Sequence, residues 1–130
     1  MQKDNITDYL YMTMLPVLLD GKKRAGEIAL EMYMRHGITP HWFGRGMDIR
    51  LAFCAERHPL PATPGILSDE ILTEILLDFA EEHGGLLVLY PCSPAAEAFI
   101  ARTSAALESQ YVIQPLGEGD PLAPLVRNID

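Results

Sequence analysis

The chain has 130 residues and a mass of 14.4 kDa, a length that predicts a single domain. Eighteen acidic residues against ten basic ones give a formal net charge of −8. This charge disfavours non-specific binding to nucleic acid and to anionic membrane surfaces, because both depend on lysine and arginine. An enzyme that must build a nucleotide pocket, bind two substrates and close over them usually needs a longer chain.

The sequence indicates neither a membrane span nor a secretory leader. The longest apolar run, residues 86–92, is much shorter than the ~20 residues that a bilayer requires. Asp4 and Asp8 interrupt the basic region that a signal peptide would need. Two cysteines, Cys54 and Cys92, cannot make a disulfide framework, so we expect free thiols and a cytoplasmic location.

Hydrophobic runs typical of buried strands alternate with helical periodicity along the chain. Residues 1–11 are a polar lead-in, and residues 117–130 are a linker with two glycines and two prolines. The pattern predicts strands at 12–19, 38–43, 86–90 and 111–113, helices at 25–36, 47–52, 68–83 and 94–107, and a short extended piece after residue 52. We therefore expect residues 12–116 to form a three-layer α/β/α domain with a mostly parallel, Rossmann-like sheet of four to five strands. Pro16 indicates either that the first strand starts after it or that this part of the strand lies at an edge.

Ligands of such sheets bind beyond the carboxyl ends of the strands. We expect a crevice there, with these substrate- or anion-binding residues: Gly21, Lys22, Arg24, Arg45, Cys92 and Ser93. Basic side chains beside a helix N-terminus predict a carboxylate or phosphate ligand. The alternative is a solvated basic turn, which is the commoner role of a run of charges.

Two glycine motifs for nucleotides fail in the first predicted turn. Gly21 and Gly26 have the spacing of a phosphate-binding P-loop, but Glu27 follows where a lysine is needed. Lys23 stands where the dinucleotide fingerprint has its middle glycine. We therefore expect Gly21 to permit a tight turn and Gly26 to pack the helix closely on the sheet.

Cys92 lies between a predicted strand and a helix N-terminus, where the pKa of a thiol can fall. The phosphatase loop needs an arginine at position 98, and a thioredoxin motif needs a second cysteine at position 95, but both positions are alanine. A structural role for Cys92 is favoured over a nucleophilic one.

No metal site is expected. Cys54 and His58 are four residues apart and could share a helix face, but further ligands would come from His36, His41 or His83 without a recognisable spacing.

The order of these segments resembles the N-terminal, pre-ATP-grasp domain of ATP-grasp ligases, in the style of the carboxylate–amine ligases, biotin carboxylase, carbamoyl-phosphate synthase and the D-aspartate-ligase-like enzymes. The resemblance covers residues 15–115, about four fifths of the chain. It depends on the order of several short segments, each weak alone. They are Asp20-Gly21 with residues 26–30, His36-Gly37-Ile38, residues 42–45, the proline loop before the acidic helix 68–83, residues 86–93 and residues 111–115.

The resemblance implies a domain that helps to form the site for a carboxylate substrate or acyl phosphate. ATP and magnesium would bind in an ATP-grasp domain that follows, and residues 122–130 resemble the approach to it. We therefore expect a truncated N-terminal domain, inactive alone and without a cofactor of its own, whose partners are a small carboxylate-containing substrate and the C-terminal ATP-grasp domain.

Three alternatives remain open. The chain could be a stand-alone Rossmann-like module that binds a small anion or a partner without catalysis. A flavodoxin-like or response-regulator-like enzyme ranks last, because Asp20 alone replaces the acidic pair of the latter. Apolar residues of the first and last segments could be covered by the missing domain or by a second copy, so a homodimer is also open.

Overall fold

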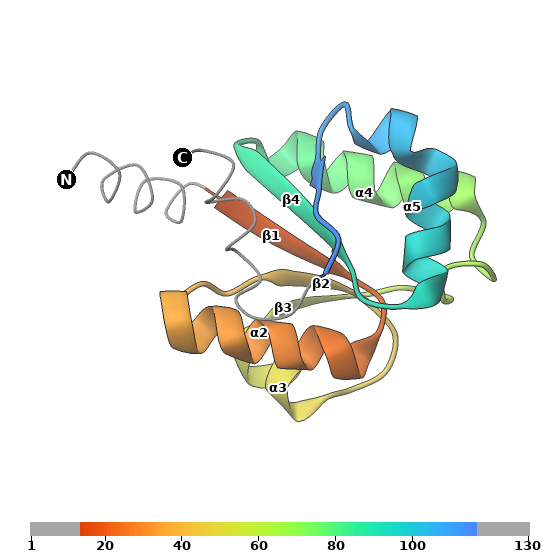
Figure 1. The fold of residues 1–130 in the computed structure, drawn as a ribbon. Coiled ribbons are helices and arrows are strands. Elements are labelled where there is room, and N and C mark those ends of the chain that lie inside the picture. The colour runs from red at the N-terminus through yellow and green to blue at the C-terminus, as the bar shows by residue number, and fades with distance from the viewer. Residues whose placement is uncertain (1–13, 117–130) are drawn as a thin grey trace.

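The computed structural model describes residues 14–116, in which strands and helices alternate (Figure 1). The strands are β1 (Met14–Leu19), β2 (His41–Gly44), β3 (Glu56–Pro59), β4 (Leu86–Pro91) and β5 (Val112–Ile113). The helices are α2 (Lys22–His36), α3 (Ile49–Cys54), α4 (Asp69–His83) and α5 (Pro94–Leu107). The predicted lead-in and linker lie outside the described residues.

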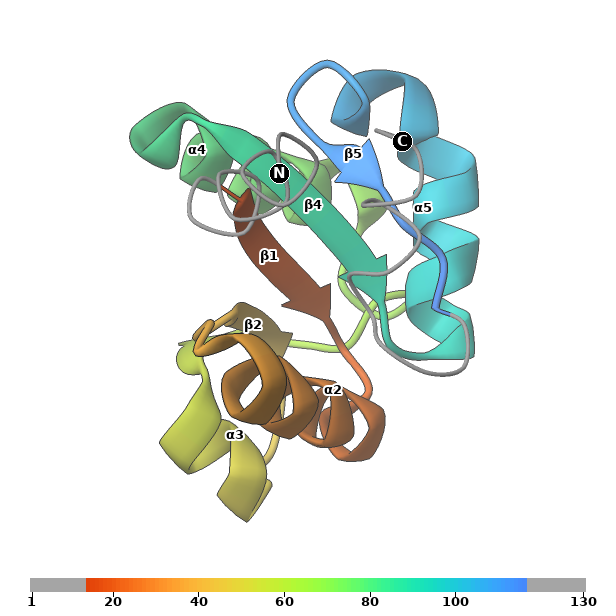
Figure 2. The same ribbon diagram turned by 60° about the vertical axis from the view of Figure 1, so that its left-hand side comes forward.

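The five strands form one parallel sheet in the order β3-β2-β1-β4-β5. Helices α2 and α3 cover one face, and α4 and α5 cover the other, as Figure 2 shows. The chain builds β1, β2 and β3 outward in one direction and then returns to add β4 and β5 on the other side of β1. The prediction of a three-layer, Rossmann-like α/β domain is confirmed.

The sheet carries a separate apolar core on each face because strand side chains alternate between faces. Val17 and Leu19 of β1 pack under α4 and α5, while Leu18 packs under α2 and α3. All three side chains are fully buried. The near-continuous apolar run of β1 therefore reflects a central strand that is covered on both sides.

The expectation that the first strand starts after Pro16 is wrong, because the central strand β1 contains it. The alternative, that this part of the strand lies at an edge, is confirmed on the side of β2. Alternate residues of a strand direct their backbone N–H and C=O groups to alternate neighbours. The amide of Asp20 donates to the Phe43 carbonyl of β2 at 2.7 Å, so Pro16, four residues earlier, also faces β2. The pairing of β1 with β2 starts only at Val17↔His41. The missing N–H of Pro16 thus faces a stretch without a partner strand.

The helix ends follow the sequence signals closely. Ser68 and Ser93 each accept a hydrogen bond from the backbone of the first turn, and Gly37 ends α2 in a left-handed conformation. The bounds of three elements differ by up to three residues: β2 is His41–Gly44 and not 38–43, α3 is Ile49–Cys54 and not 47–52, and α2 begins at Lys22 and not at residue 25. The basic run is therefore the first turn of a helix and not a loop before it.

The ambiguous segment after residue 46 forms α3 and then β3, which is the fifth strand at the edge of the sheet. Cys54 ends α3 and His58 lies in β3, so the idea that they share a helix face is wrong. Gly26 packs against this segment and not against a strand. A Cβ atom on Gly26 would lie 2.5 Å from a carboxylate oxygen of Asp48, the residue that caps α3.

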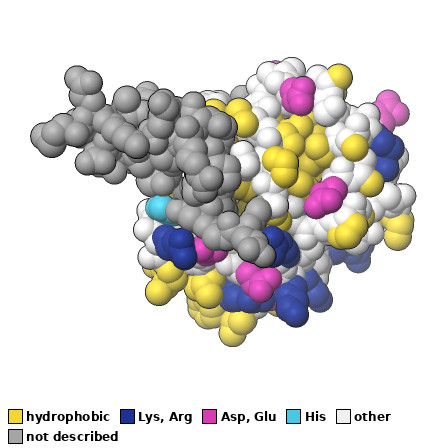
Figure 3. All heavy atoms as spheres, in the orientation of Figure 1, with side chains coloured by type: hydrophobic (Ala, Val, Ile, Leu, Met, Phe, Trp, Pro, Cys, Tyr) yellow, Lys and Arg dark blue, Asp and Glu magenta, His cyan; other side chains and the backbone are white. Residues whose placement is uncertain are grey.

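Several large apolar side chains are exposed on α2, on α3 and in the loop before α3, and Figure 3 shows such side chains at the lower edge, where α3 lies. They are Leu30, Tyr33, Met34, Met47, Ile49 and Phe53. The terminal segments that were expected to expose apolar residues lie outside the described part of the chain. Within residues 14–116, no helix has both the length and the apolar character needed to cross a membrane.

Candidate functional site

The predicted crevice lies between β1 and β4, where the order of the strands changes direction. The chain leaves β1 into α2 on one face of the sheet and leaves β4 into α5 on the other (Figure 1). The N-termini of both helices border an open cavity of about 560 Å³. Its lining residues are Gly21, Lys22, Lys23, Arg24, Glu27, Cys92, Ser93 and Pro94. This is the position at which doubly wound sheets bind ligands.

Five of the six predicted site residues line this cavity, although they come from two segments that are far apart in the sequence. Arg45 is the exception, because its guanidinium donates a hydrogen bond to the Pro61 carbonyl and it is not a lining residue. The lining also contains Lys23, which belongs to the predicted basic turn, and Glu27 and Pro94, which the sequence did not indicate as site residues.

Asp20 holds the turn between β1 and α2 in a strained conformation. Its φ of 62° is the one positive value of a non-glycine residue in the described chain. Three hydrogen bonds hold it there: its amide donates to Phe43, its carbonyl accepts from the Trp42 indole at 2.9 Å, and its carboxylate accepts from the Ser93 hydroxyl at 2.5 Å. Strain that is fixed from several sides is characteristic of functional turns. The hydrogen bond to Ser93 ties the two sides of the crevice together.

Gly21 is required where the two sides approach each other most closely. Its φ is +55°, and a Cβ atom there would lie 1.9 Å from the carbonyl oxygen of Cys92. The β1–α2 turn therefore rests directly on the backbone that follows β4. The expected tight turn at Gly21 is confirmed, and the close contact with β4 is an additional reason for glycine.

The first turn of α2 combines an uncapped end with three cations. Gly21 provides no side-chain cap, and Lys22, Lys23 and Arg24 follow it without an acidic residue in the turn. Each cation at a helix N-terminus is opposed by the helix dipole, by ~0.3–1 kcal/mol. Helices α4 and α5 have the favourable arrangement instead, with a serine cap and acidic first-turn residues. An anion at the start of α2 would supply the missing cap and neutralise the cations.

Cys92 is not a nucleophile in this structure. Its side chain is buried, and burial raises the pKa of the thiol to about 12. The thiol donates a weak hydrogen bond to the Tyr90 carbonyl at 3.5 Å. Burial therefore outweighs any effect of the helix N-terminus on this pKa, in agreement with the structural role that the sequence favours.

The lining suits binding better than bond cleavage. The lining carries three cations and the carboxylate of Glu27, and the carboxylate of Asp20 lies beside it on Ser93, so positive charge remains in excess at the crevice of a chain with a net charge of −8. The Ser93 hydroxyl is occupied, because it donates to Asp20 and accepts from the Ala96 amide at 3.0 Å. The cavity can therefore hold and orient an anionic group.

Comparison with known proteins does not place the chain in a family: no family model, no curated protein and no solved structure matches it. A function must therefore be inferred from the fold and from the crevice.

Proposed function

We propose that this chain is the N-terminal, substrate-side domain of an ATP-dependent carboxylate–amine ligase of the ATP-grasp type. In this role its crevice holds the carboxylate of a small substrate, while the ATP-grasp domain of the full ligase binds ATP and magnesium. Two features support the proposal: the sheet order, and a crevice at the carboxyl ends of β1 and β4.

One observation carries the assignment of a carboxylate ligand. The first turn of α2 is the one long-helix N-terminus of the described residues that has neither a side-chain cap nor an acid, and it borders the cavity. A carboxylate there accepts from the free backbone amides of the first turn and pairs with the exposed Lys22 and Arg24 side chains. A basic turn that only faced solvent would not need these unpaired backbone amides.

A titration of the purified chain tests the site. Small mono- and dicarboxylates, and inorganic phosphate as a second probe, are titrated at low ionic strength and followed by thermal shift and calorimetry. We expect a saturable rise in Tm that is lost in the double variant Lys22→Gln/Arg24→Gln. The control variant Arg35→Gln/Arg57→Gln removes the same two charges elsewhere and should respond as the natural chain does.

Two results would contradict the site. One is an absence of any response to all of these anions, and the other is an equal response of both double variants. The first alternative, a stand-alone module that binds a small anion, shares this site and is distinguished by the gene. A ligase requires an ATP-grasp coding region in frame after the codon for Asp130 or in an adjacent gene, and a gene without either favours the stand-alone module.

A further inference from the structure

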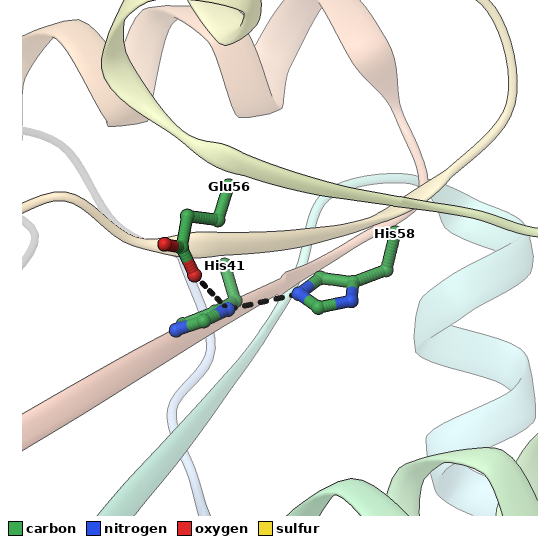
Figure 4. Close-up of side chains that lie close together, drawn as sticks. All are labelled: His41, Glu56 and His58. Atoms are coloured by element: carbon green, nitrogen blue, oxygen red, sulfur yellow. Dashed lines mark hydrogen bonds and ion pairs between the residues drawn. The ribbon is translucent and has the colours of Figure 1, made fainter.

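A second group of polar side chains lies away from the crevice, where β2 and β3 run beside the end of α4. His41 is the first residue of β2, and Glu56 and His58 lie on the adjacent edge strand β3. The register pairs His41 with Glu56 and Phe43 with His58, so all three polar side chains are on the face of the sheet that α4 covers. Figure 4 shows them converging on one point.

Three atoms with lone pairs meet there. Nδ1 of His41 lies 2.9 Å from Nε2 of His58 and 3.2 Å from a carboxylate oxygen of Glu56. Each of the three residues offers one ligand atom, and these three atoms all lie within 4.8 Å of one another. Two ligand atoms ~2.1 Å from a tetrahedral zinc ion are ~3.4 Å apart. The two distances from His41 Nδ1 are therefore each within about half an ångström of the separation that one ion requires.

Hydrogen bonds among the three residues cannot satisfy all of them. If His41 Nδ1 carries a proton, that proton is shared between two acceptors, His58 and Glu56. If it carries none, it accepts from His58, and its lone pair then faces the carboxylate of Glu56, which can only accept. The first arrangement divides one proton between two acceptors, and the second opposes two acceptor atoms. A divalent cation between them resolves this conflict because all three atoms can donate to it.

The surroundings prepare the imidazoles for a metal. Burial lowers the pKa of both His41 and His58, which is the direction that favours the neutral imidazole a metal ion binds. The His58 ring stacks on Phe43, with ring centroids 4.4 Å apart, and this contact fixes its orientation. Glu56 is exposed, so its carboxylate is free to adjust its position.

His83, the last residue of α4, lies next to the cluster with its ring centroid 5.4 Å from that of His41. Its Nδ1 donates to the carbonyl of Phe79 at 2.9 Å, because a carbonyl can only accept. Its Nε2 therefore carries the lone pair in the neutral ring. Either His83 or a water molecule can supply a fourth ligand.

We propose that His41, Glu56 and His58 form a binding site for a divalent transition metal ion of the zinc type. Two imidazoles and one carboxylate suit zinc, and a fourth position is left for His83 or water. The sequence did not predict the site, because its ligands are joined by the register of two parallel strands and not by a local spacing. The proposal does not rest on the function of the crevice.

Metal titration of the chain without a histidine tag tests this site. Zn²⁺ is titrated at pH 7.5 in competition with a chromophoric chelator, and Co²⁺ is added separately to record its visible spectrum. We expect one equivalent of Zn²⁺ to bind, weaker binding of Co²⁺, and a four-coordinate Co²⁺ spectrum without a thiolate band. Mg²⁺ should not compete, because it prefers a shell of oxygen ligands.

Two variants with matched controls locate the metal. Glu56→Gln and His58→Asn should each weaken Zn²⁺ binding ~10-fold or more, whereas Glu70→Gln and His36→Asn should leave it unchanged. Glu56 is exposed, so Glu56→Gln retains the fold, which circular dichroism verifies. The proposal is overturned by an absence of saturable Zn²⁺ uptake, by unchanged affinity in Glu56→Gln, or by a Co²⁺ spectrum with a thiolate band.

Discussion

The close approach of β1 and β4 at the crevice predicts a large loss of stability from Gly21→Ala. The new methyl carbon would lie 1.9 Å from the carbonyl oxygen of Cys92 and 2.5 Å from its carbonyl carbon. A left-handed conformation costs an alanine about 1–2 kcal/mol, and forcing backbone apart in a packed region costs about 1–3 kcal/mol. The sum, about 2–5 kcal/mol, is a large part of the 5–15 kcal/mol that stabilises a typical domain.

Gly37→Ala is the matched control for this prediction. Gly37 has a φ of +66°, close to that of Gly21, but nothing lies within 4 Å of its Cβ position. It should therefore lose only the conformational part, about 1–2 kcal/mol. Urea unfolding measures both variants, and Gly21→Ala should have the lower midpoint, by about 1 M for a slope of 1–3 kcal/mol/M. Equal midpoints for the two variants would refute the tight contact between the β1–α2 turn and the end of β4.

Three further results are expected. Burial raises the pKa of the Cys92 thiol to about 12, so this thiol should resist alkylation at pH 8 in the folded chain and react after unfolding in urea. Peptide mass mapping measures the labelling, and fast labelling of the folded chain would contradict the prediction. The Arg50 guanidinium holds the pKa of Asp48 at about 2, below the value of 3.8 in an unfolded chain. The ionised Asp48 carboxylate therefore contributes its full stability above about pH 4, and this contribution disappears as the pH falls to 2. The unfolding free energies of the natural chain and Asp48→Asn should converge over that range, and a constant difference would argue against the ion pair. Ser68→Ala should lower the free energy of unfolding by ~1 kcal/mol, because it removes only a helix cap. Ser93→Ala should lower it more, as measured by thermal unfolding, because it also removes the hydrogen bond that holds the strained Asp20. Equal losses would show that the link to Asp20 adds nothing.

Much of the fold could be predicted from local patterns. Apolar runs such as residues 86–90 mark strands that are buried on both faces, and Ser68 and Ser93 mark helix starts because their hydroxyls satisfy free amides. The start of α2 was missed because the apolar periodicity begins three residues after the helix does. The sequence left two alternatives open for Pro16 because the cost of a missing N–H depends on which neighbour it faces, and only the register of β1 and β2 shows this.

The two candidate sites differ in how far the sequence could indicate them. The crevice was predictable because an alternating α/β order fixes which loops meet, so Lys22 and Ser93 could be placed together before any geometry was known. Arg45 was misplaced because nothing in the sequence indicates that it turns to the Pro61 carbonyl. The cluster at His41 and His58 depends on the register of β2 and β3, which cannot be predicted from the sequence pattern.

The most direct test of the account is a ¹H–¹⁵N NMR titration of the chain with a small dicarboxylate. We expect saturable shifts of the backbone amides in the first turn of α2 and at Ser93, with the same affinity at each. The structure contains a second cavity of about 300 Å³ between α5 and β5, lined by residues that include Ile100 and Ile113. Shifts confined to that cavity, or shifts that do not saturate, would contradict the assignment of the β1–β4 crevice as an anion site.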